Sequence, residues 1–250
     1  MKVKVFANSE ELGKNAAIFS AQILNQAIKE KGNARLLLST GASQFDVLKS
    51  LVKENVDWKK VEMFHLDEYV SIDETHPASF RKYLKDRFTD IVQLKQVNFI
   101  NTNYNLKKNI QELTIKLRKQ QIDLSLIGIG ENSHIAFNDP PANFDTREAF
   151  IVVNLNESCK KQQVNEGWFS DIEQVPKQAV SLTVYQIMKG KVIVSCVPNK
   201  RKAKAIKMTL ENEVQNIHPA TILKKHNNAW LFLDKESASL TSKEVLDKYK

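Results

Sequence analysis

Short apolar runs alternate with longer segments of helical periodicity along most of this chain. Eight runs rich in β-branched residues or leucine read as strands, at residues 2–6, 34–39, 61–66, 97–100, 123–129, 150–155, 191–196 and 229–234. Between most of them, segments such as 10–30 and 106–120 place apolar residues on one helical face. This alternation predicts an α/β fold with a doubly wound, mainly parallel sheet and helices on both faces, which is a Rossmann-like arrangement.

The organisation along the chain favours one domain. Its 250 residues would suit one large α/β domain or two small ones, but they contain no internal repeat, low-complexity tract or obvious linker. We therefore expect a single domain over residues 1–250. The segment 140–176 is the least regular part of the chain and is a candidate for a flap.

Polar loops follow four of the predicted strands, at residues 39–43, 65–69, 128–134 and 197–202. An open α/β sheet binds its ligand at the carboxyl ends of its strands, so these loops should meet in one crevice. In "STGAS" (39–43), Thr40, Ser43 and the free N–H groups of a helix that starts near Gln44 could hold a phosphate. A simple helix N-cap at Ser43 would explain the same residues without a ligand.

The loop "GIGENSHIAFND" (128–139) contains a histidine with polar neighbours. His134 could be a buried structural histidine, but Asn132 and Asp139 could hold its ring in one tautomer for acid or base chemistry. The sequence favours neither a nicotinamide site, because a lone GxG is a weak signal, nor a metal site, because His65 and His76 have no helical spacing with His134.

Two adjacent carboxylates, Asp67 and Glu68, end the third predicted strand. They could cap a helix or lie in a solvated turn. A carboxylate in a partly desolvated crevice could instead have a raised pKa and act as a base toward a carbon acid.

The net charge of +8 raises the question of a nucleic-acid partner. The 37 basic residues are interleaved with 29 acidic ones and no ladder of stacking aromatic residues accompanies them, so we expect no nucleic-acid binding. The densest basic run, at 199–207, reads either as a solvated helix face or as a small-anion site.

Composition also bears on the compartment. The chain has no apolar run of about 18 residues that could span a membrane, and its start has no signal-peptide pattern. Cys159 and Cys196 form neither a disulfide framework nor a CxxC pair. We expect a cytoplasmic protein with reduced thiols and no membrane partner.

Several motifs, in this order, resemble those of the glucosamine-6-phosphate deaminase (isomerase) family, which is related to the 6-phosphogluconolactonases. They are "STGAS", "FHLDEYV" followed by "HPASF", "DLSLIGIGENSHIAFNDP", "VPKQAVSLTV" and "RKAKAIK". The resemblance covers residues 36–233, and the long GIG-to-NDP motif is its most specific part. "HIAFNDP" is similar to the deaminases rather than to the lactonases, where this segment typically reads like GHTASLFP.

The resemblance implies a metal-free and cofactor-free conversion of a 2-amino-2-deoxyhexose 6-phosphate to a ketose phosphate and ammonia. Asp67 would move a proton between C2 and C1, and His134, oriented by Asn132 and Asp139, would help to open the sugar ring. The sugar phosphate would be bound by a larger set of residues, namely Ser39, Thr40, Gly41, Ala42, Ser43, Glu68 and Lys202. The sequence leaves a homo-oligomer open.

Four positions depart from the family pattern. Asp139 stands where the family usually has Glu, Ser133 replaces a usual Gly, and Gln44 replaces a frequent Pro. The segment "CKKQQVNEGWF" (159–169) also lacks an arginine that usually helps to bind phosphate. Lysines in that segment or Arg147 could substitute, although lysine cannot make a bidentate guanidinium contact.

Three other functions compete with glucosamine-6-phosphate deamination. The substrate could be galactosamine 6-phosphate, or His134 could serve the hydrolysis of a 6-phosphogluconolactone. The domain could also be a non-catalytic sugar-phosphate sensor, as in transcription regulators that carry a DNA-binding segment before such a domain. The presence of both Asp67 and His134 favours an enzyme, and the first predicted strand already begins at residue 2.

Overall fold

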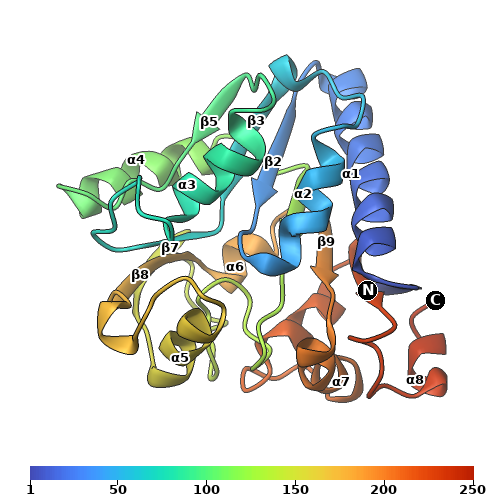
Figure 1. The fold of residues 1–250 in the computed structure, drawn as a ribbon. Helices are drawn as coiled ribbons and strands as arrows, with labels where there is room; N and C mark the ends of the chain where they lie inside the picture. The colour runs from blue at the N-terminus through green and yellow to red at the C-terminus, as the bar shows by residue number, and fades with distance from the viewer.

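Seven parallel strands form the central sheet of the computed structural model, which describes residues 1–250 apart from the side chain of Ser158. The strand order is β1-β10-β9-β6-β2-β3-β5, and every pair is parallel. Figure 1 labels β2, β3, β5 and β9 of this sheet. The strands are β1 (Lys2–Phe6), β2 (Ala34–Leu38), β3 (Val61–His65), β5 (Gln96–Asn98), β6 (Leu124–Ile127), β9 (Val192–Val197) and β10 (Ala229–Asp234). The predicted parallel α/β fold is confirmed.

Helices cover both faces of this sheet, as predicted. One face packs on α1 (Ser9–Lys31), α2 (Phe45–Leu51) and α3 (Phe80–Leu84). The other packs on α4 (Leu106–Arg118), α6 (Val184–Ile187), α7 (Ala203–Glu211) and α8 (Lys243–Asp247). Successive residues of β2 point to opposite faces of the sheet. Leu36 and Leu38 lie in the hydrophobic core on the face covered by α1, α2 and α3, and Leu37 lies in the core on the other face.

The long helix α1 shows how local sequence sets an element's ends. Asn8 precedes it, and its side chain accepts a hydrogen bond from the backbone N–H of Glu11 at 2.9 Å. Gly32 ends the helix with a φ of 77°, a left-handed conformation that glycine adopts without steric strain. The expected helix at 10–30 is therefore confirmed, with one more residue at each end.

A second, antiparallel sheet lies beside the first and corrects the prediction for residues 150–155. That segment forms β7 (Phe150–Asn154), which pairs with β8 (Gln178–Leu182), and β8 pairs with β4 (Asp67–Tyr69). The sequence did not identify β7 as antiparallel, because its exposed face carries the apolar Val152, which is 43% exposed. The segment 140–176 is also more regular than expected, since it contains β7 and α5 (Glu157–Asn165).

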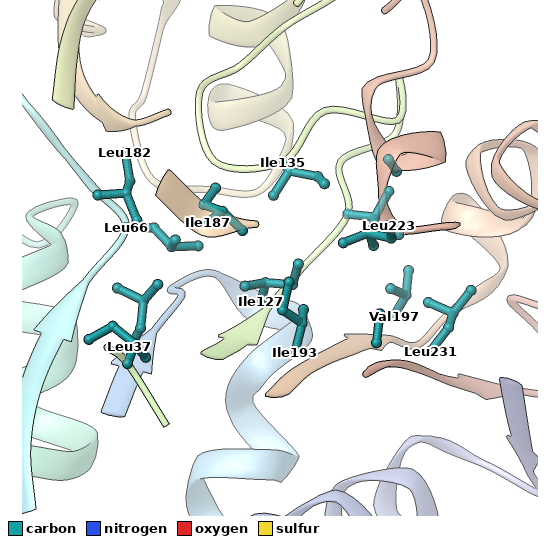
Figure 2. Close-up of a cluster of buried hydrophobic side chains, with 14 of the residues drawn as sticks. Leu37, Leu66, Ile127, Ile135, Leu182, Ile187, Ile193, Val197, Leu223 and Leu231 are labelled. Atoms are coloured by element: carbon teal, nitrogen blue, oxygen red, sulfur yellow. The ribbon is translucent and has the colours of Figure 1, made fainter. Parts of the chain in front are cut away.

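One hydrophobic cluster joins the two sheets. Leu37, Ile127 and Ile193 extend from the central sheet toward Leu66, which directly precedes β4, and Leu182, the last residue of β8 (Figure 2). Because the cluster is buried, it holds the small sheet against the central one. No helix in the part of the chain that the structure describes is both long enough and apolar enough to cross a membrane.

Candidate active site

The strand order reverses between β2 and β6, which places a crevice at their carboxyl ends. From β2 the chain proceeds outward through β3 to β5, whereas β6, β9 and β10 lie on the other side of β2. The loops after β2 and β6 therefore diverge at this point, and open α/β sheets characteristically bind ligands there.

A cleft occupies this position, and we call it the central cleft. Its walls include Thr40, Asp67, His134 and Lys202, one from each of the four loops that follow predicted strands. The prediction that these four loops converge is confirmed. The remaining lining residues are Ser39, Gly41, Ala42, Ser43, Leu66, Phe80, Gly128, Ile129, Gly130, Ala136, Phe137, Gln162, Gln163, Glu166, Trp168 and Arg201.

Asp67 brings a nearly buried carboxyl group to the central cleft. It is the first residue of β4 and follows the end of β3 at His65, where the chain leaves the central sheet for the small one. The residue is 7% exposed, and its carboxyl group hydrogen-bonds to no other described residue. Burial, and then the neighbouring Glu68 carboxylate, raise the pKa of Asp67 to about 8. Such a carboxyl group can both accept and return a proton near neutral pH.

The prediction that Glu68 contributes to the substrate site is not supported by its position. Its carboxylate accepts hydrogen bonds from Ser79 Oγ at 2.9 Å and from the backbone N–H groups of Phe80 and Arg81 at 3.1 and 3.0 Å. It also accepts one from Arg81 Nε at 3.2 Å. Glu68 is fully buried outside the lining of the central cleft and anchors the start of α3. Alternation along β4 explains this, because adjacent strand residues point to opposite sides.

His134 is held by both of its predicted partners. Its Nδ1 lies 2.7 Å from Asn132 Oδ1 and 3.1 Å from Asp139 Oδ1, and Asn132 Nδ2 donates to the same Asp139 oxygen at 3.0 Å. Both neighbours of Nδ1 are acceptors, so Nδ1 carries the proton and Nε2 is left as a free acceptor. Although burial opposes it, hydrogen bonds from His134 and Asn132 hold the pKa of Asp139 below its usual value. Asn132 and Asp139 thus orient the ring without lining the central cleft.

The loop that carries His134 is anchored to both sheets. Ile135, the next residue, inserts its side chain into the cluster of Figure 2. Asn138 Nδ2 donates to the carbonyl oxygens of Ile135 and Leu182, each at 2.8 Å, which ties the loop to β8. The histidine is therefore placed by a rigid loop, as a precise site requires.

Ser133 takes a left-handed conformation, with a φ of 70°, at the position where the family pattern usually has glycine. We expect Ser133→Gly to raise the free energy of unfolding by about 0.5 to 1 kcal/mol, because glycine adopts this conformation without strain. Urea denaturation would measure the change. Ser133→Ala removes only the hydroxyl, which lies 3.5 Å from the Ala205 carbonyl, and should not stabilise. Equal stabilisation by both variants would contradict the backbone explanation.

The loop after β2 presents unused donors to the central cleft. Gly41 has φ and ψ of 99° and 167°, a region accessible essentially only to glycine, and Tyr83 Oη donates to its carbonyl at 2.9 Å. The backbone N–H groups of Thr40 and Gly41 donate to no other described residue, and the buried Ser39 Oγ has no hydrogen-bond partner there either. The side chain of Ser43 makes no helix-capping hydrogen bond, so the arrangement fits the binding of an oxyanion better than a simple helix N-cap.

Lys202 supplies a buried positive charge to the same cleft. It directly precedes α7, as predicted, and is 4% exposed, with no carboxylate within ion-pair distance among the described residues. Burial lowers the pKa of its ammonium group from the ordinary value. A buried ammonium without a protein partner is unfavourable unless a ligand anion supplies one.

Several residues of the central cleft were not identified from the sequence. Arg201 comes from the short turn before α7, while Gln162, Gln163, Glu166 and Trp168 come from α5 and the turn that follows it. Polar helix positions such as these carry no signal of their own, because α5 reaches the cleft only through the tertiary fold. Gln163 is tied to the small sheet, since Tyr69 Oη donates to its side-chain oxygen at 2.7 Å.

The basic residues suggested as substitutes for the missing arginine lie elsewhere. The Arg147 guanidinium stacks 4.6 Å from the Tyr185 ring, and Lys160 pairs with Glu157 at 3.2 Å. Lys161 lines a separate cavity. Among the described residues, no group of three or more His, Cys, Asp or Glu side chains is arranged to hold a metal ion.

Nearly the whole chain is similar to known proteins. Residues 7–232 match the family described as glucosamine-6-phosphate isomerases/6-phosphogluconolactonase. The glucosamine-6-phosphate deaminase of Thermoanaerobacter sp. (strain X514) is 34% identical, across 98% of this chain and 97% of that protein. The glucosamine-6-phosphate deaminase of Exiguobacterium sibiricum is also 34% identical, across 98% of this chain and 95% of that protein.

Solved structures agree with these relatives. A monomeric glucosamine-6-phosphate deaminase superposes with a TM-score of 0.87 at 30% identity and covers 96% of this chain and 100% of that one. A 6-phosphogluconolactonase from Trypanosoma brucei superposes with a TM-score of 0.78 at 16% identity, over 96% of this chain and 98% of that one. At that low identity the second comparison establishes a shared fold and nothing finer.

Proposed function

Because the chain belongs to the glucosamine-6-phosphate isomerase/6-phosphogluconolactonase family, we propose that it converts glucosamine 6-phosphate to fructose 6-phosphate and ammonia. The observation that carries this proposal is the pairing of Asp67 and His134 across one cleft whose other walls suit a phosphate. The deaminases that are 34% identical to the chain support the same substrate.

The reaction begins with opening of the sugar ring. The free Nε2 of His134 takes the proton of the C1 hydroxyl and returns it to the ring oxygen as the C1–O5 bond breaks, which leaves an aldehyde at C1. A neutral imidazole suits both transfers, because its Nδ1 proton stays with Asn132 and Asp139. These two residues therefore act by positioning the ring.

The isomerisation then needs one base that works on two adjacent carbons. Asp67 removes the proton from C2, the electron pair moves through C1 onto the aldehyde oxygen, and this oxygen takes a proton from the substrate's ammonium group, which gives an enolamine. Return of the proton from Asp67 to C1 gives an iminium group at C2, to which water adds before ammonia leaves. The pKa of about 8 at Asp67 keeps its conjugate acid strong enough to be a donor and its base form accessible.

The most direct test is a comparison of substrates. The purified protein should release ammonia from glucosamine 6-phosphate, with fructose 6-phosphate formed in equal amount. Galactosamine 6-phosphate tested in parallel separates the two epimers, and 6-phosphogluconolactone separates deamination from lactone hydrolysis. Hydrolysis of the lactone with no ammonia from either amino sugar would overturn the proposal.

Lys202→Ala should raise KM for glucosamine 6-phosphate by an amount equivalent to roughly 1.5 to 3 kcal/mol, the value of a charge-assisted hydrogen bond. The reason is that the substrate phosphate would lose its contact with the buried ammonium group of Lys202. Steady-state kinetics measure the effect. Lys202→Met, which retains most of the apolar stem, separates loss of charge from loss of packing and should show a similar increase.

Lys204 and Lys207 provide matched controls for general loss of positive charge. Both are exposed on α7, within five residues of Lys202, and neither lines the central cleft. Lys204→Ala and Lys207→Ala should leave KM close to that of the parent protein. If all three alanine variants shift KM equally, or none does, the phosphate site lies elsewhere.

A further inference from the structure

Arg201 and Lys202 are consecutive residues whose side chains both line the central cleft. The chain reaches them through Asn199, which has a φ of 79° and whose backbone N–H donates to Asp234 Oδ2 at 2.9 Å. That contact fixes the turn after β9 against the end of β10. Lys202 lies at the bottom of the cleft, whereas the Arg201 side chain, 38% exposed, lies at its margin.

The guanidinium of Arg201 has no hydrogen bond to any other described residue. Its two nearest carboxylates are Glu131, 3.9 Å from Nε, and Glu166, 3.8 Å from Nη1, and both lie beyond hydrogen-bond distance. By contrast, Arg81 bonds to Glu68 and to the carbonyl of Ile72. Arg201 therefore retains its donors for a ligand, and Glu131 and Glu166 hold the group near the cleft by charge alone.

The charged and polar groups around Arg201 also favour the binding of an anion. Burial lowers the pKa of the Lys202 ammonium group; the carboxylates of Glu166 and Glu131 oppose that lowering, and the positive charge of Arg201 adds to it. These two carboxylates offset part of the repulsion between Arg201 and Lys202, and an anion bound in the cleft would offset more of it. The same cleft holds the free N–H groups of Thr40 and Gly41 and the unpartnered Ser39 Oγ.

We infer that Arg201 supplies the guanidinium that binds the substrate's phosphate, in place of the arginine missing from 159–169. The inference rests on the proposed function, since it concerns the phosphate end of the same site. A guanidinium offers two parallel N–H donors to phosphate oxygens, and Lys202 adds a point charge from below. The requirement for a phosphorylated sugar is then set by two residues of one turn.

Arg201→Ala tests this inference, with Lys200→Ala as the matched control, because Lys200 is an exposed cation in the same turn that does not line the cleft. Arg201→Ala should raise KM for glucosamine 6-phosphate by about 10- to 100-fold, with a much smaller change in kcat. Arg201→Lys should recover only part of the loss, since lysine cannot bind in a bidentate manner. Lys200→Ala should behave like the parent protein.

Calorimetric titration with inorganic phosphate gives a readout that does not depend on turnover. Arg201→Ala should weaken phosphate binding by at least about tenfold relative to both the parent protein and Lys200→Ala. Equal phosphate affinity in the Arg201→Ala variant and the parent, or an equal loss in Lys200→Ala, would overturn the inference. If glucosamine 6-phosphate is not a substrate but Arg201→Ala still weakens phosphate binding, the proposed function fails and the role of Arg201 stands.

Discussion

Asp67→Asn should lower kcat for deamination by about 10²- to 10⁴-fold, the typical effect of losing a general base. The substitution removes the proton acceptor at nearly constant volume in a buried position, so the cleft should keep its shape. Measured turnover and calorimetric phosphate binding together check this, because binding should be retained while turnover is lost. Near-normal kcat in this variant would exclude Asp67 as the base.

The same residue should set the pH dependence of the parent protein. Only the ionised carboxylate can take the C2 proton, and the pKa of Asp67 is raised to about 8 by burial and by Glu68. The value of kcat/KM should therefore fall by up to tenfold for each pH unit below about 8 and level off above it. A profile that stays flat from pH 6 to about pH 9 would be inconsistent with this assignment.

Stability should change in the opposite direction to activity. Because the carboxyl pKa is higher in the folded chain than in the unfolded one, the folded state binds more protons between pH 3.8 and about 8. The contribution of Asp67 to the free energy of unfolding therefore decreases as the pH rises through that interval. Asp67→Asn removes this penalty, so the variant should be more stable than the parent in urea at about pH 9 and little different near pH 4.

The sequence predicted the central sheet from the periodicity of its apolar residues. It also predicted the edge that holds the cleft, because open α/β sheets bind ligands at the carboxyl ends of their strands. It missed β4, whose three residues "DEY" are polar or aromatic and too short for a periodic signal. That omission explains why Glu68 was expected to line the cleft. Had residues 67–69 been identified as a strand, alternation would have sent Asp67 and Glu68 to opposite sides.

The residues that α5 and the turn before α7 contribute to the cleft could not be predicted from the sequence for a different reason. Glu166 and Arg201 are far apart in the chain, and nothing in either segment indicates that their side chains meet at one cleft. In a basic run such as 199–207, a cation that lines a site and a solvated cation have the same sequence signature. Only burial and partners separate them, as they do for Lys202 and Lys204.

Gly130→Ala should lower kcat/KM by on the order of 10²-fold or more, because it would displace the His134 ring. A Cβ atom on Gly130 would lie 2.1 Å from His134 Cε1 and 2.2 Å from Nε2, far inside contact distance. The backbone cannot yield easily, since the Gly130 N–H donates to the His134 carbonyl at 2.9 Å and its own carbonyl accepts from Ser133 at 3.0 Å. The ring must therefore move away from Asn132 and Asp139. Steady-state kinetics with glucosamine 6-phosphate measure the loss.

A double-mutant comparison shows whether Gly130 acts through the histidine. In a His134→Ala background the ring is absent, so adding Gly130→Ala should cause little further loss, and the two effects should be strongly non-additive. Gly128→Ala is the control for a methyl group in the same loop, because its Cβ would meet Ser43 Oγ and Gln44 Nε2 at 3.4 Å, a tolerable distance. Additive effects of Gly130→Ala and His134→Ala would mean that the glycine shapes the cleft independently of the ring.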